Sequence, residues 1–79
     1  MIEMDLMGAV MKPSDLKVCK SCQNLNWYSN DTCINMECED EFFTTDTDVV
    51  KARIQEDYDF YMGEEGMTEK EVDHILIEV

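Results

Sequence analysis

The chain contains 79 residues, of which 44% are hydrophobic, and its 19 acidic and 6 basic side chains give a formal net charge of -13. This length leaves room for one small domain, but not for a core that also walls a deep catalytic cleft, so we expect no enzyme. No apolar run approaches the ~20 residues of a membrane-spanning helix, and we expect no membrane partner. A surface this negative repels phosphate backbones, which disfavours nucleic-acid binding.

The first segment, residues 1–15, is expected to be either a flexible tail or a flap that covers another element. Four of its first eleven residues are methionine, which favours the flap, and Pro13 marks a break before the cysteine-containing region. Glu3 and Asp5 stand where an export signal carries Lys or Arg. The sequence therefore indicates no export signal and predicts a cytoplasmic protein with reduced thiols.

The second segment, residues 16–43, carries all four cysteines. Residues 16–19 alternate apolar and polar side chains, which predicts a short strand leading into the cysteine region. Residues 22–38 are rich in Asn, Ser and Asp and lack a helical period, so they predict loops and a short β-hairpin. Phe42 and Phe43 indicate a further strand or a hinge.

The third segment, residues 44–79, is expected to form an acidic helical hairpin. An apolar stripe with spacings of four, four and three residues predicts a helix over residues 46–62, with Thr45 and Asp48 as a capping pair. The apolar stripe consists of Val50, Ile54, Tyr58 and Tyr61. The helical segment also lies in the part of the chain that carries most of the charge, because the fourteen acids and three bases of residues 39–79 give -11.

A second helix is predicted after Gly63 and Gly66. Thr68 and Glu71 have the spacing of a capping box, and Met67 and Val72 have the spacing of a hydrophobic staple. The apolar residues that follow have helical spacing up to the end of the chain, and we expect them to share a core with the first helix. They are Val72, Ile75, Leu76 and Val79. The predicted fold is a small α+β unit: a four-cysteine zinc knuckle with a short β-hairpin, followed by a two-helix antiparallel hairpin.

The cysteine spacing is Cys19-x2-Cys22-x10-Cys33-x4-Cys38. Two close pairs of thiolates joined by a short loop are typical of a tetrahedral Zn2+ site, in which the metal replaces a core that so polar a segment cannot form. Three alternatives remain: two disulfides, which need an oxidising compartment; a rubredoxin-like iron site, which usually has two x2 pairs; and free thiols. The pattern favours one structural zinc ion.

The run Cys22-Gln-Asn-Leu-Asn-Trp-Tyr-Ser-Asn-Asp-Thr-Cys33 resembles zinc fingers of the Ran-binding-protein type, whose pattern is Cys-x2–4-Cys-x3-Asn-x6-Cys-x2-Cys. The resemblance covers residues 18–38 and places Asn26 at the Asn of that pattern. Asn24, Leu25 and Trp27 match the Asn-aliphatic-Asn-aromatic run of the RNA-binding branch, in which the aromatic residue stacks on bases. The resemblance therefore implies a zinc finger whose Trp27 would suit single-stranded recognition.

The chain departs from this family at the residues that contact ligands. Lys17 stands where a Trp usually precedes the first cysteine, and Ser29 and Asn30 replace the arginines that bind bases. Gln23 and Asn24 replace the Thr-Phe of the ubiquitin-binding branch, and the second cysteine pair has four intervening residues. We therefore expect a shared scaffold without either ligand surface.

Two groups of side chains are candidates for contact with a partner. Trp27 and Tyr28 are expected either to pack against the knuckle or the helices, or to form an exposed docking platform. The acidic-aromatic tract over residues 56–61 forms either a solvated helix face or a docking face for a basic protein. Its candidate residues are Asp57, Tyr58, Asp59 and Tyr61.

The sequence thus favours a non-catalytic, zinc-binding adaptor or regulator that docks on another protein with a basic surface. His74 is the only histidine and has no nucleophile or carboxylate partner at a catalytic spacing, which also argues against an enzyme. The alternatives are a single-stranded RNA-binding zinc finger and a rubredoxin-like iron protein.

Overall fold

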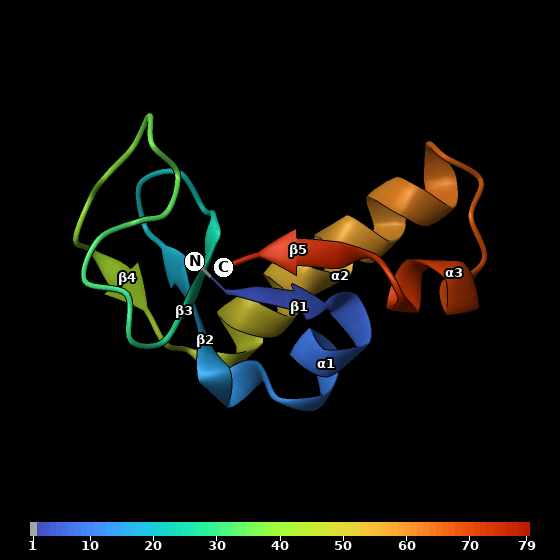
Figure 1. Ribbon diagram of the computed structural model, residues 1–79, viewed down its shortest axis with the longest axis horizontal. Helices are drawn as coiled ribbons and strands as arrows, with labels where there is room; N and C mark the ends of the chain where they lie inside the picture. The colour runs from blue at the N-terminus through green and yellow to red at the C-terminus, as the bar shows by residue number, and fades with distance from the viewer. Residues whose placement is uncertain (1) are drawn as a thin grey trace.

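The structure, a computed structural model, describes residues 2–79 and contains two small antiparallel sheets packed with three α-helices (Figure 1). In chain order the elements are β1 (Glu3–Asp5), α1 (Leu6–Met11), the 3-10 helix η1 (Pro13–Asp15), β2 (Leu16–Cys19), β3 (Leu25–Trp27), β4 (Phe43–Thr44), α2 (Thr47–Gly63), α3 (Glu69–Asp73) and β5 (Leu76–Glu78). The predicted small α+β class is confirmed.

The cysteine-bearing sheet has the strand order β3-β2-β4, and both pairings are antiparallel. Its central strand is the one that the alternating pattern of residues 16–19 predicts. Leu16 and Val18 point into the core because side chains alternate across a strand. The hairpin pairs Val18 with Leu25, and β4 begins at Phe43, where a strand or hinge was expected.

Helix α2 lies within one residue of the predicted range and buries Val50, Ile54 and Tyr58. The prediction that Thr45 and Asp48 form its capping pair was wrong. Asp46 is the N-cap, and its carboxylate accepts hydrogen bonds from the backbone N–H groups of Asp48 (2.9 Å) and Val49. A short carboxylate side chain next to the positive helix start satisfies both free donors.

The second predicted helix is correct at its start and wrong at its end. Thr68 and Glu71 form the expected capping box, but α3 stops at Asp73. The chain then continues as β5, in which Ile77 faces inward and Leu76 is 64% exposed. Leu76 is therefore not a core residue, because the strand alternates its side chains where a helix would have placed this one inside.

Strand β5 forms the second sheet with β1, which brings the two ends of the chain together (Figure 1). Met4 pairs with Ile77, and the backbone N–H of Val79 donates to the carbonyl of Ile2 (2.8 Å). The described part of the first segment, residues 2–15, is packed against the rest of the chain, since α1 buries Leu6 and Ala9 completely. Within residues 2–79, no helix is both long and apolar enough to cross a membrane.

One hydrophobic core joins all of these elements. It draws on α1, on the cysteine-bearing sheet, on α2, on α3 and on the end of the chain. Its buried members are Leu6, Ala9, Leu16, Val18, Leu25, Val50, Ile54, Tyr58, Val72 and Val79.

Truncation of the α2 side chain at the centre of this core will destabilise the protein. Ile54 is 2% exposed, so Ile54→Ala is expected to lower the free energy of unfolding by about 2–5 kcal/mol, through lost burial and the cavity left behind. Chemical denaturation measures this change. Leu76→Ala removes a similar volume from an exposed position and is the matched control, with an expected change within ~0.5 kcal/mol. Equal losses for the two variants would contradict this assignment of the core.

Candidate metal centre

The first cysteine pair lies in the turn between β2 and β3. Cys19 ends β2, and the backbone N–H of Gln23 donates to the carbonyl of Cys19 (2.8 Å), which closes the turn around Cys22. Gln23 has a positive φ of 63°. This left-handed residue turns the chain back sharply after Cys22, and both thiols face the same side.

The second pair is held in the same manner by the loop between β3 and β4. The backbone N–H groups of Cys38 and Glu39 donate to the carbonyl of Asn35 (2.9 and 3.0 Å), and that of Cys33 donates to the carbonyl of Asp40 (2.8 Å). Glu39 has a φ of 52°. Each pair is therefore followed directly by a left-handed residue, and the two turns act as equivalent halves of one site.

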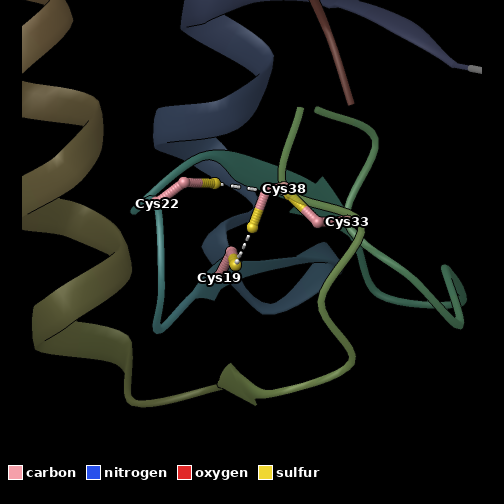
Figure 2. A group of neighbouring side chains, drawn as sticks. All are labelled: Cys19, Cys22, Cys33 and Cys38. Carbon is pink, nitrogen blue, oxygen red and sulfur yellow. Dashed lines mark hydrogen bonds between the residues drawn. The ribbon is translucent and has the colours of Figure 1, made fainter. Parts of the chain in front are cut away.

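The four thiol groups converge between these turns (Figure 2). All four Sγ atoms lie within 4.8 Å of one another. The Sγ atoms of Cys19 and Cys38 are 3.6 Å apart, and those of Cys22 and Cys33 are 3.5 Å apart. A Zn–S bond of about 2.3 Å places two corners of a tetrahedron about 3.8 Å apart, whereas a disulfide needs about 2.05 Å. The arrangement therefore fits a tetrahedral metal site and not two disulfides.

The fully buried side-chain amide of Asn26 holds the cysteine cluster in place through hydrogen bonds. Asn26 is 0% exposed, and its Nδ2 donates to the Cys33 sulfur (3.5 Å) and to the carbonyl of Asn24 (3.1 Å). Its Oδ1 accepts from the backbone N–H of Ile34 (2.8 Å). One side chain thus connects both cysteine turns, and it orients a thiol as the partners behind a metal ligand do.

The same amide connects the metal centre to the end of the chain. Asn30 donates from Nδ2 to Asn26 Oδ1 (3.3 Å) and to the main-chain oxygen of Val79 (2.7 Å). The backbone N–H of Trp27 donates to the same oxygen of Val79 (2.8 Å). The sequence did not predict this bracing role for Asn30, and no local pattern indicates it, because its partner lies 49 positions away.

Lys17, which stands where zinc fingers of the Ran-binding type usually carry a Trp, has a structural role. Its ammonium group lies 3.9 Å from the centre of the Phe43 ring and donates to the carbonyl of Asn30. A cation over an aromatic face is attracted by the ring quadrupole. Lys17 of β2 therefore contacts both β4 and the start of the loop that follows β3.

The thiol groups differ in how readily they ionise. Burial would raise the pKa of Cys22, but hydrogen bonds from the Asn24 backbone and from the other thiols lower it to about 7. A hydrogen bond from the Asp40 backbone would lower the pKa of Cys38, but burial and two neighbouring thiols raise it to about 12. Ionising the whole cluster gathers like charges in one place, and a bound dication would offset their repulsion.

The aromatic candidates of the knuckle differ in exposure. Trp27 is partly buried against the core, whereas Tyr28 is 58% exposed. Their ring centroids are 5.3 Å apart with a tilt of 47°. Tyr28 therefore presents most of its ring to solvent, and Trp27 presents only part of its ring.

The tract on α2 is divided between the core and two sides of the helix. Tyr58 belongs to the core and donates to Asp73 Oδ1 (2.5 Å), and burial followed by this carboxylate raises the pKa of Tyr58 above its usual value. Tyr61 and Asp57 line a hollow beside β5, where Asp57 also accepts from Arg53 (2.8 Å). Asp59 is exposed on the other side, next to α1. The structure does not bring these four residues onto one face.

The chain matches no protein-family model, no curated protein and no solved structure. The four clustered thiols support a zinc-finger-like knuckle. No family match supports the Ran-binding type in particular.

The support from Asn26 can be tested through metal affinity. Asn26→Ala removes the donor to the Cys33 sulfur, and such partners typically change metal affinity by roughly 10- to 100-fold. We expect a loss in this range when the protein competes with a chromophoric chelator for Zn2+. Ser29→Ala alters an exposed residue on the same loop and is expected to leave the affinity unchanged. An unchanged affinity for Asn26→Ala would show that the amide does not orient the thiol.

Proposed function

We propose that this chain is a non-catalytic, zinc-binding adaptor or regulatory protein of the cytoplasm, which docks on another protein with a basic surface. The observation that carries the proposal is the closed set of four sulfur ligands within 4.8 Å of one another. Four protein ligands complete a tetrahedral coordination sphere and leave no position for a substrate or an activated water. A metal held in this way stabilises the fold and performs no chemistry.

Zinc is favoured over iron on the form of the site. Both metals accept four thiolates, but the second pair here has four intervening residues, whereas rubredoxin-like sites usually have two in each pair. The thiols are free in the structure, and a reducing compartment such as the cytoplasm maintains that state. Asn26 stands at the Asn of the Ran-binding-type pattern, and its hydrogen bond to the Cys33 sulfur is the contact that supports a zinc-finger-like site.

Native mass spectrometry of the purified full chain is expected to show one zinc ion per molecule and a colourless protein. A chelator is expected to remove the ion and, with it, the dispersed amide signals of residues 18–38, because the loops that carry the cysteines have few apolar side chains to hold them together. A red protein would establish iron, and a metal-free protein with unchanged amide signals would contradict the proposal.

Docking on a protein is favoured over binding of single-stranded RNA. The positions that would hold base-reading arginines carry Ser29 and Asn30, and the Asn30 amide is already bonded to Asn26 and Val79. A stacking ring contributes only ~1–3 kcal/mol per base. The net charge of -13 adds repulsion from phosphates. A basic protein surface is attracted by the same charge, and two of the candidate contact residues are exposed: Tyr28 of the knuckle and Asp59 of the acidic-aromatic tract.

Fluorescence anisotropy with mixed-sequence RNA oligomers tests this choice. At about 0.1 M salt, where charges are screened beyond ~10 Å, we expect no saturable binding in the micromolar range. Saturable binding that Trp27→Ala weakens and Phe42→Ala leaves unchanged would instead support an RNA-binding finger. Phe42 is the matched control because it is an exposed aromatic residue of the same knuckle, outside the Asn-aliphatic-Asn-aromatic run.

A further inference from the structure

A groove runs along α2 on the side that faces α1. One part of it, about 480 Å³, is lined by Met7 and Val10 of α1, by Met62 of α2 and by residues of α3. A second part, about 330 Å³, continues past Val10 to Lys51. The two parts share Val10 and Gln55. Residues 51 to 62 of a helix span about 16 Å, so the groove follows roughly three turns of α2.

The groove has an apolar floor that is open to solvent. Met7 is 41% exposed, Val10 is 50% exposed and Met62 is 43% exposed. Methionine side chains are flexible and polarisable, and they adapt to the shape of an apolar partner. These three exposed apolar side chains come from two helices and lie around one concave surface, where an apolar side chain of a partner would contact them.

The rim of the groove is acidic. Asp59, Glu69 and Asp73 line it, and Lys51 is the only basic side chain among the lining residues. Helix α1 contributes no charged residue to its wall. The site therefore combines an apolar floor, provided mainly by α1, with carboxylates supplied by α2 and α3.

We propose that this groove binds a basic amphipathic helix of a partner protein. The inference rests on the docking role proposed above and assigns that role to the surface between α1 and α2. Apolar residues along one face of such a helix would occupy the floor beside Val10 and Met62, and its Lys or Arg side chains would meet the carboxylates of the rim. The walls are helices whose backbone groups are already paired, so they offer no edge to an extended peptide.

Charge complementarity selects this occupant over two others. A second copy of the chain would bring another net charge of -13 to the same surface, and the two copies would repel each other. An anionic membrane surface would be repelled by the same rim. A cationic amphipathic helix is the occupant that makes favourable contacts with both the apolar floor and the acidic rim.

The test uses the zinc-loaded full chain and a fluorescent peptide of roughly sixteen residues, about 24 Å as a helix, with leucines at i, i+3, i+4 and i+7 and Lys or Arg elsewhere. We expect saturable binding at about 0.1 M salt that weakens as the salt concentration rises. A peptide of the same composition with a scrambled order is expected to bind at least tenfold more weakly. Equal binding of the two peptides would overturn the proposal, because charge alone would then account for it.

Paired variants locate the site. Val10→Glu places a charge on the floor and is expected to weaken binding at least tenfold, whereas Met36→Glu makes a similar change at a residue of the knuckle loop that is 84% exposed and is expected to have no such effect. Asp59→Lys reverses a charge of the rim, and Glu41→Lys makes the same reversal outside it. Thermal denaturation and zinc content are measured on every variant, and Asp59→Lys keeps the test available if Val10→Glu fails to fold.

The possible outcomes separate this inference from the proposed function. If Val10→Glu and Asp59→Lys leave peptide binding unchanged, the groove is not the binding site, and the proposed docking role would belong to another surface of the chain. A zinc-free native chain, or saturable RNA binding, contradicts the proposed function whatever the peptide does. Self-association that Val10→Glu abolishes, or binding to phosphatidylserine vesicles, would assign the groove to another occupant and overturn the proposal.

Discussion

The four sulfur atoms of the knuckle lie within 4.8 Å of one another, at a spacing where ionised thiolates repel each other unless a cation lies between them. Much of the surrounding chain serves to hold this arrangement. Both turns place a left-handed residue, Gln23 or Glu39, directly after a cysteine, although such a backbone costs a side-chain-bearing residue of order 1 kcal/mol. A metal ion bound by the four thiolates would offset this cost, because it would supply cohesion that so polar a segment lacks.

Asn26 joins the cysteine cluster to the rest of the molecule through hydrogen bonds. Its side chain contacts a cysteine on one side and Asn30 on the other, and Asn30 holds the main-chain oxygen of Val79. Val79 is completely buried and forms part of the core that α2 and α3 share. The cysteine cluster and the end of the chain are therefore connected through two asparagine side chains.

The groove arises from the same long-range closure. Pairing of β1 with β5 fixes the start of α1, whose first turn is capped by Asp5, and α1 then lies against α2 and α3. Leu6 and Ala9 face the core, so the neighbouring positions Met7 and Val10 face outward beside the carboxylates of α2 and α3. A helix of six residues buries only one narrow stripe, and its remaining apolar side chains form the floor of the groove.

The end of the chain shows where the sequence was ambiguous. Val72, Ile75 and Val79 have spacings that fit one helix face, but Ile75, Ile77 and Val79 also alternate as in a strand. Both patterns make Val79 an inward residue, so apolar spacing did not distinguish them. Antiparallel pairing with β1, more than seventy residues earlier in the chain, favours the strand and leaves Leu76 exposed.

The sequence by itself determined the features that depend on neighbouring residues. The spacing of Cys19, Cys22, Cys33 and Cys38 indicated one metal site, the alternation of residues 16–19 indicated β2, and the capping box at Thr68 indicated the start of α3. Only the tertiary structure decided the features that depend on distant partners. Four such features bring together segments that are separated by more than ten residues. They are the strand at Leu76–Glu78, the contact between Asn30 and Val79, the burial of Tyr58 away from the predicted docking face, and the groove beside α1. Local propensities and spacings carry no information about such pairings, because the free energy that selects them comes from burial and hydrogen bonding across the assembled fold.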